Sequence, residues 1–325
     1  MKKYLFLIIV CLILKCTTLF GQQEPMNTMF AYNKLQTNPA YTGGKDLLSM
    51  RAVYRTQWVK LPGAPRTINF NIHSPVKKER IAVGLSVLND IAGSVNQTNL
   101  TPSFAYRIPF KNDTKLSFGI SAGIKFYKIN VTTLTATDVN DPLLGTNYSG
   151  VAPTMGFGLY YYGRKFYVGL SSPNILPMDL IRKNKELAQM TTDRFQQVGH
   201  MYLSGGYTFE IGKKKNFWIQ PQLLFKYLMT SKYKIPFEID ANLTFTLYKI
   251  ANIGLTYRTG FANIYDNRES IDIMTMFNLP KGFSVSYSYD ITLANSKTFH
   301  NNSHEILLGY DVDIRKKGVR TPRYF

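Results

Sequence analysis

The sequence is poor in cysteine: the 325 residues contain two, Cys11 and Cys16, both near the amino terminus. A small scaffold held together by disulfides is therefore excluded. Carboxylates are also scarce, with 20 Asp and Glu against 39 Lys and Arg, so the formal charge is +19. After the amino-terminal region, no stretch approaches the eighteen or so uncharged apolar residues of a membrane-spanning helix, which excludes a helical membrane protein.

Aromatic residues, in contrast, are abundant. Phe, Trp and Tyr make up 14% of the chain, with 22 Tyr and 21 Phe. Disordered chains lack such residues, so we expect a folded protein. The length suits one large domain or two average ones.

The amino terminus has the layout of a secretory signal peptide. Lys2 and Lys3 precede an apolar run over residues 4–14, which is too short to span a membrane. We expect cleavage after Gly21, so that the mature chain begins at Gln22. A lipoprotein anchored through Cys16 is the less favoured alternative, because Lys15 stands where a small residue is needed. Cleavage removes both cysteines, so stability must come from a large core or a closed sheet.

Apolar and polar residues alternate with a period of two almost throughout the mature chain. Residues 283–291 read Phe-Ser-Val-Ser-Tyr-Ser-Tyr-Asp-Ile, and residues 237–247 and 116–126 follow the same pattern. This pattern is typical of β-strands with one apolar and one polar face. The segments run mostly to nine to twelve residues, whereas soluble strands average about five or six and a strand crossing a bilayer needs about nine to eleven.

About fourteen such strands are expected, an even number as in single-chain bacterial barrels. They are placed at residues 46–57, 65–73, 80–89, 97–108, 114–127, 150–162, 165–171, 198–211, 216–229, 237–247, 250–261, 269–277, 282–291 and 303–314. Every second connection is short, which is typical of periplasmic turns, and the others are mostly longer. The sequence thus predicts an all-β fold, a single-chain antiparallel transmembrane β-barrel of the bacterial outer membrane, with both termini periplasmic.

These patterns divide the chain into four parts. Residues 1–21 are the expected signal peptide, and residues 22–45 an amino-terminal segment that lies either in the periplasm or inside the barrel as a plug. Residues 46–314 are the expected barrel, and residues 315–325 a basic periplasmic tail.

Basic residues gather at the short turns and in the tail, which places them on one periplasmic rim. They include Lys77, Lys78, Arg164, Lys165, Lys213, Lys214, Lys215, Lys316 and Lys317. One interpretation is that their long side chains anchor the barrel at the membrane interface. The other is that they form a dock for an acidic periplasmic partner. Nucleic acid is not expected as a partner of an exported chain without a nucleic-acid-binding fold signal.

The sequence has little that points to catalysis. Of the four histidines, His300 and His304 alone have the spacing of a metal pair, and they lie in a polar loop that we interpret as solvated. His73-Ser74 precedes Pro75 in a turn, and no acid is identifiable to orient the histidine. We therefore expect neither a catalytic site nor a metal or other cofactor.

Several local motifs go beyond what a barrel demands. These are Asn38-Pro39-Ala40-Tyr41-Thr42-Gly43, Tyr54-Arg55-Thr56-Gln57-Trp58 and Gly63-Ala64-Pro65-Arg66-Thr67, followed by Ile72-His73-Ser74-Pro75 and residues 84–90. In these motifs the chain resembles the PorP/SprF family of type IX secretion system membrane proteins, found in the Bacteroidota. Thr42, where alanine is common, is a small departure. Each motif also has a local interpretation as a turn, a tight loop or, for Trp58, an interface aromatic.

The resemblance implies an outer-membrane component or accessory of the type IX secretion system. Such a protein supports the secretion and surface anchoring of cargo that carries a type IX carboxy-terminal signal, including adhesins in gliding members, and it contacts periplasmic machinery components and outer-membrane lipid. It implies protein binding rather than catalysis. The candidate partner-binding residues are Asn38, Pro39, Tyr41, Gly43, Tyr54, Arg55, Gln57, Trp58, Gly63 and Pro65.

Two other classes of protein stay open at this stage. One is a passive channel or a transporter barrel for hydrophobic ligands in the outer membrane, against which the Ser-, Thr- and Gly-rich inward face argues. The other is a soluble secreted β-sandwich adhesin, which would show the same alternation of apolar and polar residues.

Overall fold

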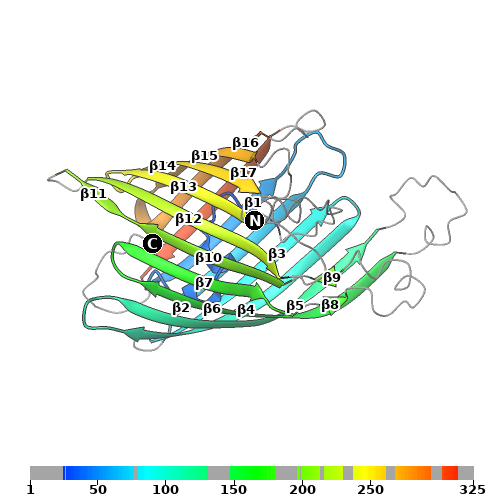
Figure 1. The fold of residues 1–325 in the computed structure, drawn as a ribbon, viewed down its shortest axis with the longest axis horizontal. Helices are drawn as coiled ribbons and strands as arrows, with labels where there is room; N and C mark the ends of the chain where they lie inside the picture. The colour runs from blue at the N-terminus through cyan, green and yellow to red at the C-terminus, as the bar shows by residue number, and fades with distance from the viewer. Residues whose placement is uncertain are drawn as a thin grey trace, which may run out of the picture.

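The protein forms one antiparallel sheet that closes on itself as a barrel (Figure 1). The computed structural model describes residues 25, 27–76, 80–130, 147–176, 178–179, 196–197, 199–212, 216–229, 237–260, 268–293 and 302–313. The expected signal peptide and basic tail lie outside these residues. Among the described residues, no helix combines the length and apolarity needed to cross a membrane.

The strands of the sheet follow one another in chain order, and strands that pair are antiparallel. They are β1 (Leu48–Thr56), β2 (Arg66–Pro75), β3 (Ile81–Ala92), β4 (Val95–Pro109), β5 (Lys115–Ile129), β6 (Tyr148–Tyr162), β7 (Phe166–Asn174), β10 (Gly199–Tyr207), β11 (Phe209–Ile211), β12 (Phe217–Met229), β13 (Glu238–Leu247), β14 (Ala251–Gly260), β15 (Arg268–Asn278), β16 (Phe283–Thr292) and β17 (Ser303–Val312). Outside the barrel, the two-residue strands β8 (Met178–Asp179) and β9 (Gln196–Gln197) pair with each other.

Strands β10 and β11 are two parts of one crossing. Both pair with β12 in a single register, Gly206 opposite Gln222 and Phe209 opposite Ile219. Between them, the Thr208 N–H donates to the Lys165 carbonyl at 2.6 Å, and the facing stretch of β12 holds Pro221, which has no N–H to give. Counted by crossings, the described chain forms a fourteen-stranded barrel, which confirms the predicted fold.

The first and last strands close the barrel. β1 pairs with β17 over its whole length, from Leu48 opposite Val312 to Thr56 opposite His304. An open edge in hydrocarbon leaves backbone N–H and C=O groups unpaired, at a cost of several kcal/mol each. Closure of the sheet removes these edges, and its single-layer geometry excludes the β-sandwich alternative.

The two faces of each strand divide as the alternation predicts. In β14 the outward side chain of Leu255 is 50% exposed, whereas the inward Thr256 is fully buried. In β16 the outward Tyr287 is exposed and the inward Ser288 is buried. An apolar outer face and a polar lumen are typical of outer-membrane barrels, so the outer series faces lipid.

Substitution of a lipid-facing residue by Arg is expected to destabilise the barrel strongly at the middle of the membrane and only weakly at its edge. Leu255→Arg, in the middle of β14, should lower the free energy of unfolding in lipid by about 2–4 kcal/mol, and Phe283→Arg, at the short-turn end of β16, by about 0–1 kcal/mol. Both side chains belong to the outward series of their strands and are at least half exposed. Urea titration in lipid vesicles measures both, and equal losses would contradict the assignment of the lipid face.

The barrel wall is higher on one side than the sequence alternation predicts. β3 and β4 run on to a two-residue turn at Gly93 and Ser94, beyond the expected ends at residues 89 and 97. Here Asn89 donates to Asn96 at 2.9 Å and to Thr98 at 2.8 Å. Outward polar residues such as Asn89 and Thr98 interrupt the apolar alternation here, although the two strands stay paired up to Ala92 opposite Val95.

Candidate functional site

Residues 27–47, the lumenal segment, lie inside the barrel rather than below it (Figure 1). The side chains of Met29, Phe30 and Tyr41 are at most 4% exposed. Two 3-10 turns, η1 (Lys34–Gln36) and η2 (Pro39–Tyr41), compact the segment. It then leads into β1 at the end of the barrel that holds the short connections, named here the short-turn rim; the opposite end is the long-loop rim.

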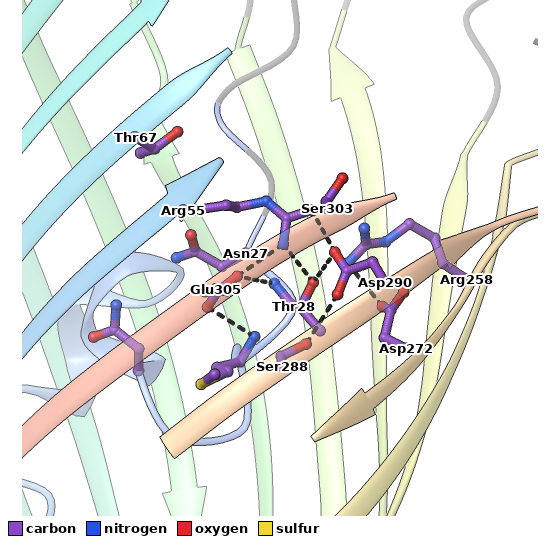
Figure 2. A network of polar contacts seen from close by, with 12 residues as sticks. Asn27, Thr28, Arg55, Thr67, Arg258, Asp272, Ser288, Asp290, Ser303 and Glu305 are labelled. Atoms are coloured by element: carbon purple, nitrogen blue, oxygen red, sulfur yellow. Dashed lines mark hydrogen bonds and ion pairs between the residues drawn. The ribbon is translucent and has the colours of Figure 1, made fainter. Parts of the chain in front are cut away.

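The start of the lumenal segment is held by an ion cluster on both strands of the closing seam (Figure 2). The Thr28 N–H donates to Glu305 of β17 at 2.9 Å, and its hydroxyl donates to Asp290 of β16 at 2.7 Å. Arg55 of β1 pairs with Asp290 at 2.7 Å and with Glu305 at 2.9 Å, and it also donates to the Thr28 hydroxyl at 2.6 Å. The cluster is buried, so each charge depends on its partners.

The charged side chains continue around the lumen wall on the neighbouring strands. Arg258 of β14 pairs with Asp240 of β13 at 2.9 Å and lies 3.7 Å from Asp272 of β15. Lys226 of β12 pairs with Asp240 at 2.9 Å and with Glu238 at 3.4 Å. A belt of basic and acidic side chains thus runs along the inner face from β12 to β1, with carboxylates on the three successive strands β15, β16 and β17.

Polar and aromatic contacts hold the middle of the segment. Asn33 donates to Asn69 at 2.9 Å, and Asn71 donates back to Asn33. The Lys34 ammonium donates to the Ala31 carbonyl at 2.6 Å and lies 4.8 Å from the centre of the Tyr167 ring. Burial, with a smaller contribution from the charge of Lys45, lowers the pKa of Lys34 to about 7.

The Asn38–Tyr41 turn sits in a socket lined by glycines. Asn38 caps η2 through the Ala40 N–H at 2.8 Å and donates to the Leu159 carbonyl at 3.0 Å. A Cβ on Gly119 of β5 would lie 2.1 Å from the Ala40 nitrogen, and one on Gly158 of β6 would lie 2.0 Å from the Asn38 side-chain oxygen. The wall therefore approaches the segment this closely only because it has no side chains there.

The aromatic side of the same turn packs against the barrel wall. The Tyr41 ring meets Tyr160 and His73 edge-on, each with ring centres 5.5 Å apart. Leu35, Ala40, Tyr162 and Tyr167 complete this buried apolar cluster.

The end of the segment is fixed near the short-turn rim. The Gly43 N–H donates to His73 Nδ1 at 3.0 Å, and Arg107 donates to the Gly43 carbonyl at 2.7 Å and to Asp46 at 2.6 Å. Lys115 adds a contact to Asp46 at 3.1 Å. Gly43 has φ +71°, and a Cβ there would lie 2.4 Å from that of Ala82, so both conformation and space require glycine.

The motif residues singled out in the sequence separate into two groups. Six are buried on the lumen side of the chain: Asn38, Pro39, Tyr41, Gly43, Arg55 and Gln57. All of these except Gln57 take part in the contacts described above between the lumenal segment and the wall. Burial keeps these six away from any partner in this arrangement. Tyr54 lies on the lipid-facing side, and Trp58, Gly63 and Pro65 lie in the β1–β2 connection at the long-loop rim. A partner-binding role for the latter three stays a prediction.

Several residues of the site are not among the candidate site residues predicted from the sequence. Thr28, Asp290, Glu305, Arg107 and Asp46 anchor the lumenal segment at its two ends. The available signal was the occurrence of charged residues on an inward face otherwise made of Ser, Thr, Asn and Gly. The sequence pattern could not show which of these charged residues pair with each other, because closure of the barrel brings the pairs together.

The short-turn rim carries exposed basic residues at five of its connections: Arg80, Lys111, Arg164, Lys249 and Lys281. Lys165 pairs with Glu210 at 2.8 Å, and the Lys249 ammonium lies 5.5 Å from the Trp218 ring centre. The other predicted rim residues, Lys77, Lys78, Lys213, Lys214, Lys215, Lys316 and Lys317, lie outside the described residues. Within the described residues, no group of three or more His, Cys, Asp or Glu has the arrangement of a metal site.

Comparison with solved structures identifies the fold. The chain is similar to the CymD monoaromatic hydrocarbon channel, with 9% identity and a TM-score of 0.53, covering 91% of this chain and 95% of that one. It is also similar to the TodX deltaS2S3 mutant monoaromatic hydrocarbon channel, with 10% identity and a TM-score of 0.52, covering 87% and 94%. A FadL homologue from Pseudomonas aeruginosa aligns at 9% identity with a TM-score of 0.47, covering 91% and 96%. At these identities the likeness to the first two structures shows the barrel fold alone.

The family comparison is more specific. None of the curated proteins compared with the chain matches it significantly. The family model described as type IX secretion system membrane protein PorP/SprF matches residues 19–310, which include the lumenal segment and nearly the whole barrel. Its family is not a known enzyme family, and the closed barrel with a lipid-facing apolar surface is that of an outer-membrane protein. The chain therefore belongs to the PorP/SprF family of type IX secretion system membrane proteins.

Proposed function

We propose that this outer-membrane protein supports type IX secretion by binding other proteins, with its barrel as the anchor. In this proposal the short-turn rim docks periplasmic components of the machinery. The loops of the long-loop rim hold cargo that carries a type IX carboxy-terminal signal, at the cell surface.

One observation carries this proposal: the lumen holds a segment of the chain itself. Ions and hydrogen bonds fix the lumenal segment at its start, at its middle and at its end, through Thr28, Asn33, Asn38 and Gly43. A barrel of about fourteen strands is narrow enough to be filled in this way. Because the lumen is occupied, the two rims are the surfaces that remain for binding other proteins.

The charge of the short-turn rim supports periplasmic docking. Arg80, Lys111, Arg164, Lys249 and Lys281 are exposed on separate turns around the barrel mouth. A ring of one charge sign speeds up the encounter with an acidic surface and discriminates against basic ones. The same side chains also suit anchoring at the membrane interface, which acts alongside docking.

The alternative function, transport of small hydrophobic ligands, has the fold likeness to two monoaromatic hydrocarbon channels in its favour. That likeness concerns the fold and not the lumen. The inward side chains of the described strands include Asn69, Asn242, Asp240 and Arg258, which present polar atoms to a passing ligand. Uptake of an aromatic hydrocarbon by vesicles containing the protein would support this alternative.

Reversing the charge of the rim tests the docking proposal. We expect Lys111→Glu, Arg164→Glu and Lys281→Glu together to reduce crosslinked co-purification of periplasmic machinery components by about tenfold, since each lost charge pair near a surface contributes a fraction of a kcal/mol. The loss should diminish as salt is raised.

The matched control reverses charge at the opposite end. Lys60 and Arg66 are exposed at the long-loop rim, and Lys60→Glu with Arg66→Glu should leave the co-purification unchanged. Heat-modifiable gel mobility verifies that every variant is a folded barrel. Full co-purification by the short-turn variant would contradict docking and leave anchoring as the role of the rim. Normal secretion of type IX cargo from a deletion strain would contradict the proposed function as a whole.

A further inference from the structure

A cavity of ≈ 120 Å³ lies inside the barrel, between the lumenal segment and the wall from β3 to β13. The wall leaves this space because several of its inward residues there are small. Ser86 of β3 lies opposite Thr101 of β4, and Thr154 of β6 lies opposite Gly123 of β5. The start of the lumenal segment is bonded to the closing seam, so the cavity lies on the other side of the lumen.

The cavity belongs to the half of the lumen near the long-loop rim. Asn174, at the end of β7, and His200, at the start of β10, line it, and both strand ends belong to that rim. Toward the short-turn rim the cavity is bounded by Pro39 of η2, and this turn occupies the socket beside Gly119 and Gly158. A molecule in the cavity therefore cannot continue through the barrel while the lumenal segment is in place.

One part of the cavity lining is apolar. It consists of Phe30 and Leu35 of the lumenal segment, Leu88 of β3, and Leu224 and Leu228 of β12. Hydrocarbon placed against these side chains is removed from water, which is favourable. An apolar cavity of about 150 Å³ accepts a benzene ring, so the present cavity suits a hydrocarbon body of about six carbon atoms.

The other part of the lining offers hydrogen-bonding oxygens. Side-chain oxygens of Asn27, Asn99 and Thr154 are buried without a hydrogen-bond partner among the described residues, and all three residues line the cavity. A buried polar atom without a partner is destabilising, and a ligand hydroxyl supplies the missing donor. The charged side chains at the cavity, Lys226 and Glu238, already pair with each other at 3.4 Å, so the lining favours an uncharged ligand.

We propose that this cavity binds a small uncharged molecule that joins a hydrocarbon body of about six carbon atoms to a hydroxyl group, such as an alcohol or a phenol. The hydrocarbon lies against Phe30 and the leucines, and the hydroxyl donates to Asn99 or Thr154. Water alone satisfies the oxygens but leaves the apolar side chains hydrated, whereas a pure hydrocarbon leaves the oxygens without donors. The site goes beyond protein docking, because it lies in the lumen and uses none of the basic residues of the rim.

Protection of a thiol from labelling tests this binding on the full chain in detergent. Cys11→Ala and Cys16→Ala remove the two natural cysteines, and Ser121→Cys then places one thiol in the cavity lining. Cyclohexanol at about ten times its Kd should slow iodoacetamide labelling of this thiol about tenfold, since only the unoccupied site reacts. Labelling of Arg66→Cys, exposed at the long-loop rim, should not change.

Two comparisons test the chemistry of the ligand. Cyclohexanecarboxylate should not protect Ser121→Cys, because its charge loses water without gaining an unpaired partner. Thr154→Val keeps the shape of the side chain and removes its hydroxyl, so the cyclohexanol concentration for half protection should rise about five- to tenfold. The matched control, Thr256→Val, changes the inner face of β14 outside the cavity lining and should leave that concentration unchanged.

Heat-modifiable gel mobility verifies that each variant is a folded barrel. If Ser121→Cys does not fold, Ser86→Cys, which also replaces a lining residue, takes its place. Labelling that cyclohexanol does not slow would overturn the proposal, and so would equal protection by cyclohexanecarboxylate. An equal change in Thr154→Val and Thr256→Val would overturn it as well.

Discussion

Gly119→Val should unseat the lumenal segment and lower the free energy of unfolding by about 3 kcal/mol, the upper part of the range for overpacked cores. The first added carbon would already lie 2.1 Å from the Ala40 nitrogen and 2.4 Å from the Pro39 carbonyl carbon. These are backbone atoms of a capped turn, so no flexible side chain can move aside. The segment has to leave the wall, and its hydrogen bond from Ser117 to the Ala40 carbonyl at 2.7 Å is lost.

Limited proteolysis of the folded barrel measures whether the lumenal segment has dissociated from the barrel wall. In Gly119→Val the lumenal segment should become cleavable within residues 27–47, while urea titration gives the loss of stability. The matched control is Gly205→Val in β10, where a Cβ meets one atom, the Tyr167 carbonyl oxygen, at an ordinary 3.6 Å. Protease resistance equal to that of the control would refute the glycine socket.

Arg55→Met is expected to cost about 3–5 kcal/mol of stability, since it leaves two buried carboxylates without their cation. Asp290 and Glu305 lie within 2.9 Å of the guanidinium, and the three side chains are at most 4% exposed. Thr28 loses a donor to its hydroxyl at the same time. Because Arg55 belongs to β1 and its partners to β16 and β17, the substitution also weakens the closing seam.

Neutralising the partners should reverse most of this loss. The triple variant Arg55→Met, Asp290→Asn, Glu305→Gln removes all three charges and keeps oxygen acceptors for the Thr28 and Met29 N–H groups. Its free energy of unfolding in urea should return to within about 1–2 kcal/mol of that of the parent. The loss in Arg55→Met comes from the unpaired buried carboxylates and not from the absence of the ion pairs themselves. A triple variant as unstable as Arg55→Met alone would show that packing, and not charge, explains the effect.

Arg51→Met provides the control from the same strand. Arg51 pairs with Asp311 at 2.7 Å, but the Asp311 side chain is 24% exposed and keeps Lys45 at 2.9 Å. Water and the second cation compensate the carboxylate, so a loss of about 1 kcal/mol or less is expected. The contrast with Arg55→Met measures how strongly the ion cluster depends on its burial.

The position of the lumenal segment was the main question that the sequence left open. Residues 22–45 had no alternation, and both a periplasmic and a lumenal location satisfied the pattern. The contacts that decide it join residues far apart in the chain, such as Thr28 with Glu305 and Asn38 with Leu159. Such contacts produce no periodic pattern in the sequence, because a single turn of the lumenal segment contacts several strands, each at one residue.

The sequence by itself determined the strands, their number and the face that each residue presents, because lipid on one side and a polar lumen on the other demand a strict alternation along every crossing. It also located the short turns, and with them the basic rim. The tertiary structure alone decided which inward charges meet, why Gly119 and Gly158 lack side chains, and where the family motif from Asn38 to Gly43 lies. Those features arise when the sheet closes around the lumenal segment, and closure brings together residues from opposite ends of the chain.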